Sequence, residues 1–210
     1  MSFKATLDET AIDRLTKEGK YDYAGELNKH DDWSTVPNFI SKLICSSNPE
    51  EPNITFERTI NAPMDFVLSK WVGQEEIAPG DAATSKHEFI ALGQVLKTED
   101  GVVEVTTGVE WDEQAKSLKR TFRSTEIDAP TSCCIKGYGG WTRATDLGDG
   151  TTKWEHGVNQ HATVAHPLFC CCCCLCWNKV GGYCLQLRFN DVEKKFAAAK
   201  STEALLMERV

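Results

Sequence analysis

The sequence has no run of about 18 or more apolar residues, and this lack excludes a conventional transmembrane helix. Its start, Met1-Ser2-Phe3-Lys4, lacks both the apolar core of a signal peptide and the glycine at position 2 that N-myristoylation needs. Basic residues are also few: 23 Lys and Arg stand against 31 Asp and Glu. The basic face of a nucleic-acid-binding protein is therefore not expected, and we predict a soluble cytoplasmic protein.

The sequence also lacks the motifs of well-known catalytic and cofactor sites. It contains no G-x-S-x-G or H-E-x-x-H motif, no P-loop and no dinucleotide-binding glycine pattern. We therefore expect neither a cofactor nor a metal. What the chain does have is 210 residues that are 41% hydrophobic and 26% charged, enough for one domain with a buried core and an extension.

Cysteines are numerous, but six of the ten lie within one short segment. Such a cluster cannot join distant segments as the disulfides of a secreted protein do, so we expect reduced thiols. Three interpretations stay open: a buried apolar turn, which we favour, then a peripheral membrane contact through S-acylation, and a metal site at C-x-x-C spacing. The lipidation candidates are Cys170, Cys171, Cys172, Cys173, Cys174 and Cys176.

The first part of the chain, residues 1–52, is predicted to be a helical extension. Thr6-Leu7-Asp8-Glu9 has the form of a capping box and precedes apolar residues at helical spacing. A second short helix is predicted over residues 37–44. Residues 46–53 are rich in Ser, Asn, Pro and Glu, and they mark the boundary with a main domain at 53–210.

The main domain has the pattern of an α+β protein. Ile54–Ile60 alternates as a strand does, and Asn61-Ala62-Pro63 begins a helix that carries Trp71. Residues 73–85 are rich in Gly, Pro and acidic residues and are predicted to form a loop. Two long strands joined by Asp100-Gly101 follow, and the second ends near Trp111. Further strands are predicted at 118–127, 135–146 and 151–163, and a helix at 177–206. Because one antiparallel sheet cannot bury a face alone, we expect this helix to lie across it.

The hairpin at Asp100-Gly101 fixes which side chains share a face. A tight turn there pairs Leu96 with Val105. The predicted covered face holds Ile90, Leu92, Gln94, Leu96, Val103, Val105, Thr107, Val109 and Trp111. The opposite face holds His87, Lys97, Glu104, Thr106 and Glu110 with the apolar Phe89, Ala91 and Val95. These three apolar residues need cover, which the N-terminal extension or a second subunit would supply.

The later hairpin, at Gly148-Asp149-Gly150, places polar side chains on the covered face. Whether its loop has two or four residues, odd positions of 135–146 share a face with even positions of 151–163. A solid core rarely holds Arg, His and Gln together, whereas a small-molecule cavity does. Alternatively, these polar side chains lie near strand ends and reach water. The predicted cavity is lined by Leu92, Val105, Trp111, Arg120, Phe122, Trp141, Arg143, Trp154, His156, Val158, Gln160 and Phe189.

In element order over residues 53–205, the chain resembles the START/SRPBCC superfamily, which includes the birch pollen allergen and the polyketide cyclases. The resemblance also rests on Phe56–Val67, where a strand is followed by Ala62-Pro63 and a helix, and on Trp71. It implies a helix-grip fold, in which a curved antiparallel β-sheet grips a long C-terminal α-helix and encloses an apolar pocket. Members bind lipids, sterols, polyketides or plant hormones, and some are cyclases, hydratases or isomerases.

The chain is therefore predicted to bind an apolar small molecule or lipid between sheet and helix, as a carrier or sensor. A second hypothesis is a cyclase or isomerase in which His156 moves a proton and Arg143 holds an enolate or carboxylate, since a two-residue turn makes them cross-strand neighbours. A third is a membrane-attached adaptor that uses Cys170–Cys176. The sequence does not predict the oligomeric state.

Overall fold

The structure is a computed structural model of the 210-residue chain. It describes residues 2–18, 21–23, 27, 54–71, 75–85, 90–97, 102–127, 135–162 and 186–201. The predicted helix at 37–44, the cysteine cluster at 170–176 and the predicted start of the C-terminal helix lie outside these residues. The interpretations of the cysteine cluster, and the domain boundary near residue 52, stay predictions.

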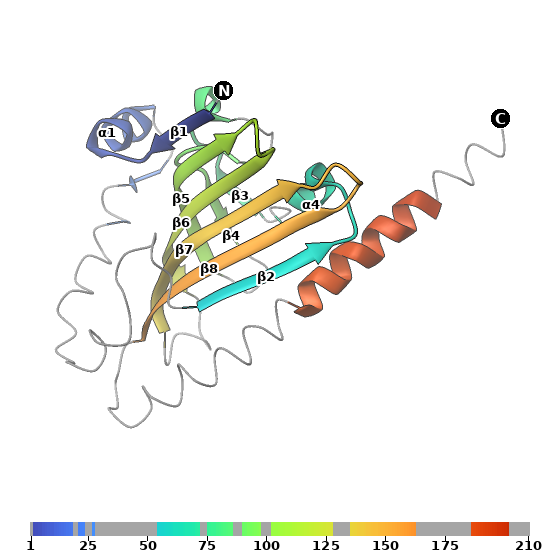
Figure 1. Ribbon diagram of the computed structural model, residues 1–210. Coiled ribbons are helices and arrows are strands. Elements are labelled where there is room, and N and C mark those ends of the chain that lie inside the picture. Colours follow the sequence, from blue (N-terminus) through green and yellow to red (C-terminus); the bar gives the residue numbers. More distant parts are fainter. Residues whose placement is uncertain are drawn as a thin grey trace.

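The described chain forms an antiparallel sheet of eight strands, which confirms the predicted α+β class. The strand order is β2-β8-β7-β6-β5-β4-β3, and β1 pairs with the part of β5 that β4 does not reach. The strands are β1 (Ser2–Thr6), β2 (Ile54–Ile60), β3 (Glu75–Ala78), β4 (Val95–Lys97), β5 (Val102–Asp112), β6 (Ser117–Ile127), β7 (Ile135–Asp146) and β8 (Thr152–Ala162). The helices are α1 (Glu9–Lys17), α4 (Met64–Trp71), the short η2 (Ala82–Thr84) and a C-terminal helix described over 186–201. Figure 1 shows α1 and the C-terminal helix at opposite ends of the sheet.

Most predicted elements of the main domain are confirmed, but the loop at 73–85 is wrong. The strand predicted before Asp100-Gly101 is also shorter than expected, because the chain turns at Gly93 and β4 begins at Val95. β2 and β7 have the predicted bounds, β6 begins one residue earlier than predicted, and β8 is one residue shorter at each end. The loop predicted over 73–85 contains β3 and η2 instead. β3 lies at the edge of the sheet and begins with Glu75-Glu76, and charged, short edge strands of this kind escape a search for apolar alternation.

The N-terminal helix is confirmed, but its cap differs from the prediction. Thr6 ends β1, a strand that the sequence did not predict, and Asp8 is the N-cap of α1. The Asp8 side chain accepts a hydrogen bond from the Ala11 N–H at 2.8 Å, which satisfies one of the donors left open at a helix start. The capping-box pattern therefore found the helix but placed its start too early.

The register of the first hairpin differs from the prediction by one residue. Val95 pairs with Val105 and Leu96 pairs with Glu104, because an odd number of residues separates Lys97 from its partner Val103. This exchanges the two faces of that part of β5, so Glu104 lies with Leu96 on one face and Val105 lies with Val95 on the other. A β-bulge between Thr106 and Gly108 then returns the later residues of β5, including Trp111, to the predicted face.

The second hairpin contains the same kind of error. Asp146 pairs with Thr152, the Leu147 N–H donates to the Thr151 carbonyl at 3.1 Å, and both Gly148 and Gly150 have positive φ angles. The turn thus has three residues, whereas the prediction allowed two or four. An odd loop pairs even residues with even ones, so Trp141 and Arg143 lie on the face opposite Trp154 and His156.

The inner face of the sheet packs against α4 and the C-terminal helix. Phe189 of that helix lies edge-on to Trp154 of β8 with ring centres 6.3 Å apart, and Arg58 of β2 forms an ion pair with Glu193 at 2.8 Å. Each large apolar side chain buried in this way contributes about 1.5–3 kcal/mol. The apolar core here includes Ile60, Val67, Leu68, Leu96, Val109, Leu118, Ala144, Trp154, Phe189 and Val192. The predicted helix-grip architecture is confirmed.

The outer face is covered at its β4–β5 end by the N-terminal segment. Leu15 of α1, Tyr23 and Leu27 pack with the valines at positions 95, 103 and 105 and with Ala78. Tyr23 is 3% exposed, although it carries a polar hydroxyl. The apolar residue Val95, which the sequence predicted to need cover, therefore receives it from the N-terminal extension.

Candidate functional site

The inner face holds a buried ion pair on two central strands. Arg120 on β6 donates from Nη1 to Oε2 of Glu104 on β5 at 2.8 Å, and the two side chains are only 6% and 10% exposed. Arg120 also donates from Nε to the hydroxyl oxygen of Thr106 at 2.8 Å. Removing two charges from water is costly, and such a pair is tolerated only with good geometry and further hydrogen bonds of this kind.

Aromatic rings extend this arrangement across the sheet. The guanidinium carbon of Arg120 lies 5.1 Å from the centre of the Phe122 ring. That ring stacks on His156 of β8, with ring centres 5.7 Å apart and planes 13° apart. His156 Nδ1 lies 3.2 Å from the hydroxyl oxygen of Thr142, its direct partner on β7. These side chains from four neighbouring strands form what we call the inner-face cluster: Glu104, Thr106, Arg120, Phe122, Thr142 and His156.

The electrostatics of the inner-face cluster keep its histidine neutral. Burial lowers the pKa of His156 from 6.5 to about 4. The negative charge of Glu104 opposes this shift, whereas the positive charges of Arg188 and Arg120 add to it. At pH 7 the imidazole is therefore neutral and can donate one hydrogen bond and accept another. Arg188 also brings a second cation, from the C-terminal helix, close to the cluster.

One donor of the inner-face cluster lacks an acceptor. Within the part of the chain that the structure describes, Nη2 of Arg120 is buried and has no hydrogen-bond partner. Buried polar groups are hydrogen-bonded in the great majority of cases, so an orphan donor marks a place for an acceptor. Oε1 of Gln94 is in the same state among the described residues, although its Nε2 donates to Glu76 at 2.8 Å.

Most of the predicted cavity residues lie on the inner face or in its core. Trp154 and Val158 are 1% and 7% exposed, as predicted, while Lys153 and Glu155 point to the other face. Gln160 pairs with Tyr138 through the backbone, and its side chain lies outside the description. The predicted residues that the structure gathers on the inner side are Leu92, Trp111, Arg120, Phe122, Trp154, His156, Val158 and Phe189.

Three predicted cavity residues are on the outer face: Val105, Trp141 and Arg143. The reason is the odd loop length of both hairpins. Arg143 pairs with Glu155, whereas His156 pairs with Thr142, so the proposed catalytic pair of Arg143 and His156 does not form. A histidine whose pKa is about 4 is also poorly matched to proton transfer near pH 7. The structure contradicts this form of the enzyme hypothesis.

Three members of the inner-face cluster were missed at the sequence level. Glu104 had left a signal, because it is the single charge in the apolar run Val102–Val105, and a buried charge requires a partner. Thr106 follows from Glu104 by alternation once that residue is placed inside. Thr142 was missed because an even loop in the later hairpin would place it on the face opposite His156, whereas the two residues are direct partners.

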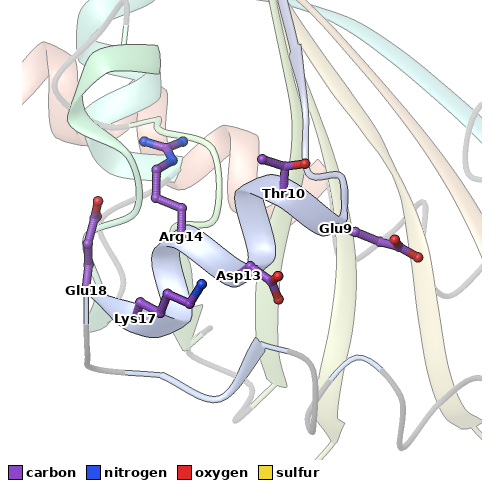
Figure 2. Close-up of a pocket in the computed structure, with 6 residues that line it drawn as sticks. All are labelled: Glu9, Thr10, Asp13, Arg14, Lys17 and Glu18. Carbon is purple, nitrogen blue, oxygen red and sulfur yellow. The ribbon is translucent and has the colours of Figure 1, made fainter.

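The surface of α1 carries a shallow depression away from the inner-face cluster. Figure 2 shows its lining residues, all of which come from α1 or the residue that follows it: Glu9, Thr10, Asp13, Arg14, Lys17 and Glu18. Arg14 reaches from this helix to Asp81, with Nη2 and Oδ2 2.6 Å apart. The depression is open to solvent and holds no buried polar group without a partner among the residues described.

The described residues show no metal centre. No group of three or more His, Cys, Asp or Glu side chains is placed there to surround an ion. Within the same ranges, no helix combines the length and apolar character needed to cross a membrane.

An antiparallel sheet whose inner face packs on a C-terminal helix is a helix-grip architecture. Among solved structures, the chain is similar to Ara h 8.0201, with 17% identity, a TM-score of 0.42, and 69% of this chain and 97% of that one covered. It is also similar to a START superfamily protein from Mycobacterium smegmatis, with 12% identity, a TM-score of 0.42, and 70% and 97% covered. A third is norcoclaurine synthase from Thalictrum flavum, with 11% identity, a TM-score of 0.36, and 77% and 92% covered.

A scan against protein-family models and a search of the curated proteins found no match. At these identities and TM-scores, the solved structures assign no function to this chain.

Proposed function

We propose that the protein is a carrier or sensor that binds a lipid or other small molecule with an apolar body and one polar acceptor group. The observation that carries this proposal is the orphan Nη2 of Arg120, buried in the inner-face cluster. An oxygen of the ligand would accept from this atom, and Phe122 with the neighbouring apolar core would contact the ligand's body.

The local charges favour a negatively charged acceptor. The charges that act on His156 come from one anion, Glu104, and two cations, Arg120 and Arg188. The proposed donor, Arg120, is itself a cation, and hydrogen bonds between a guanidinium and a carboxylate are stronger than neutral ones. The carboxylate of a fatty acid or of an aromatic acid fits both this guanidinium and the apolar surroundings.

The neutral state of His156 supports a binding role. A neutral imidazole held near Thr142 Oγ1 adds no charge to the surroundings of the proposed ligand. Each buried methylene of the ligand contributes about 0.8 kcal/mol. We therefore expect micromolar affinity for molecules with an apolar body of fatty-acid size.

Two fluorescent probes with similar aromatic bodies test this proposal. 8-Anilinonaphthalene-1-sulfonate carries an anionic acceptor, and N-phenyl-1-naphthylamine lacks it. Both should bind the native protein. Because a hydrogen bond to a charged group contributes about 1.5–3 kcal/mol, Arg120→Met combined with Glu104→Gln should weaken the sulfonate probe at least about tenfold and leave the uncharged probe within about twofold.

The outer face offers a matched control for this experiment. Arg143→Met combined with Glu155→Gln removes the same two charges from the same two residue types, and neither residue belongs to the inner-face cluster. This variant should bind both probes as the native protein does. Failure of the native protein to bind either probe, or equal losses in the two double variants, would refute the proposed site.

A further inference from the structure

The docked N-terminal segment, meaning Ser2–Lys17 with Tyr23, is connected to Arg120 by a short series of hydrogen bonds. The Tyr23 hydroxyl donates to the carbonyl of Gly93 at 2.8 Å. The Gly93 N–H donates to the carbonyl of Thr106 at 2.8 Å, and the Thr106 N–H donates to the carbonyl of Gln94 at 2.8 Å. The Thr106 hydroxyl oxygen in turn accepts from Nε of Arg120. Tyr23 and Arg120 are thus linked through one turn and one residue of β5.

A second connection runs from α1 to the same turn. Arg14 forms an ion pair with Asp81, whose side chain is 9% exposed, and each partner shifts the pKa of the other toward the charged form. The Asp81 N–H donates to the carbonyl of Leu92 at 2.8 Å, directly before Gly93. Asp81 also accepts from the Ala83 N–H through Oδ1 at 3.0 Å. The ion pair therefore holds the turn at Leu92, where the turn starts, whereas Tyr23 holds it at Gly93.

Close packing makes the turn depend on α1. Gly93 has a φ of 73°, and a Cβ placed on it would lie 2.5 Å from Cδ1 of Leu15 and 3.5 Å from the Tyr23 ring. The turn can approach α1 this closely because position 93 carries no side chain. Tyr23 is 3% exposed, and burial raises its pKa to about 12, so its hydroxyl remains a donor throughout the physiological range.

We propose that the docked N-terminal segment positions Arg120 for its ligand, with Tyr23 and Arg14 as positioning residues that act through Gly93 and Thr106. This rests on the proposed function of Arg120. Docking of the segment and binding of the ligand are then coupled, and the coupling is reciprocal: ligand binding holds the segment down, and release of the segment weakens ligand binding. The apolar patch under α1 and the ligand site on the inner face, on opposite sides of one sheet, act as one unit.

The direct test follows the Arg120 Nε–H by two-dimensional ¹H–¹⁵N NMR of the full chain. In the native protein this hydrogen, bonded to Thr106, should exchange slowly with water. Tyr23→Phe removes one hydroxyl and Arg14→Met breaks an ion pair whose arginine is 46% exposed, so that both variants should fold. We expect faster exchange of the Arg120 Nε–H in each, and binding of 8-anilinonaphthalene-1-sulfonate weakened about fivefold.

Thr152→Val is the matched control. The Thr152 hydroxyl, also fully buried, donates to the Ala62 carbonyl at 2.8 Å, the length of the Tyr23 bond, but it lies at the far end of β8. This variant should lose about as much stability as Tyr23→Phe. Both the exchange rate of the Arg120 Nε–H and the affinity for 8-anilinonaphthalene-1-sulfonate should stay at their native values. Unchanged Arg120 exchange in Tyr23→Phe and Arg14→Met, or an equal change in Thr152→Val, would overturn the positioning role. A native protein that binds neither probe would instead overturn the proposed function, while faster Arg120 exchange in the two variants would still support the positioning role.

Discussion

Among the described residues of this sheet, two Arg–Glu pairs bridge neighbouring strands, one on each face. The inner pair, Arg120 and Glu104, has a separation of 2.8 Å and side chains that are 6% and 10% exposed. The outer pair, Arg143 and Glu155, has a separation of 3.9 Å and side chains that are 40% and 20% exposed, and Glu155 also lies 3.2 Å from Lys153. The chemistry of the two pairs is the same, and only their surroundings differ.

The comparison shows that burial, not residue type, distinguishes an ion pair in a candidate site from one on the surface. The outer pair can exchange its ionic partners for water at little cost in free energy, so its presence does not indicate a functional site. The inner pair carries a desolvation penalty that a pair of apolar residues would avoid, and it is surrounded by Thr106, Phe122 and His156. One directed donor of the inner pair, Nη2 of Arg120, still faces no acceptor among the residues described.

The strongest way to break the comparison is to remove one member of the inner pair. Arg120→Met leaves Glu104 as a buried charge without its cation, and we expect a loss of about 3–5 kcal/mol in the free energy of unfolding. Urea unfolding at pH 7 measures this loss. Adding Glu104→Leu to Arg120→Met should restore most of the stability, because the uncompensated charge is then gone. If Arg120→Met has the same free energy of unfolding as the native protein, the inner pair is solvated and the interpretation is wrong.

A change of pH sharpens the comparison without altering the pair. Because the pKa of His156 is about 4 in the folded protein and near 6.5 when unfolded, the unfolded state binds a proton first as pH falls. The stability contributed by the neutral ring is complete above pH 6.5 and is lost progressively between pH 6.5 and about 4. We expect a fall on the order of 1–2 kcal/mol between pH 7 and pH 5. Urea unfolding across this range measures it, and His156→Phe should flatten the profile; equal slopes in both proteins would contradict the burial of the imidazole.

The smallest effect is expected at the outer pair. Arg143→Met should change the free energy of unfolding by about 0–1 kcal/mol, since the ion pair is long and Arg143 is partly exposed. Part of this small change should disappear in 1 M salt, which screens exposed charges. Thermal unfolding at low and high salt measures both quantities. A loss as large as that of Arg120→Met would show that the outer face is covered more deeply than its exposure indicates.

Local patterns in the sequence were sufficient for most of the fold. Ile54–Ile60 and Ile135–Asp146 were predicted with their observed bounds, because alternation and turn residues are properties of neighbouring positions. β1 was not predicted, since Ser2–Thr6 is short and gains its stability from pairing with residues 108–112 of β5, far along the chain. Such long-range pairing leaves no local signal.

The candidate site was predicted in part, and loop length explains the rest. Strand β6 was assigned correctly, so Arg120 and Phe122 were placed inside. Arg143 was placed inside and Glu104 outside because both hairpin loops were taken to have an even number of residues, whereas both are odd. Asx turns at Asp146 and Asp149 fix the later loop at three residues, with hydrogen bonds of 2.8 and 2.9 Å to the N–H groups of Gly148 and Thr151. The number of residues in this turn therefore decided that Arg143 lies on the outer face.

The pairing of β1 with β5 has a consequence for how this protein is handled. Without Ser2–Thr6, the half of β5 that contains Val109 and Trp111 would present a row of open backbone donors and acceptors at a sheet edge. Such an edge is a template on which another chain can add a strand, and two apolar residues beside it favour that addition. A shortened N-terminus or a bulky tag on Ser2 should therefore promote self-association through β5.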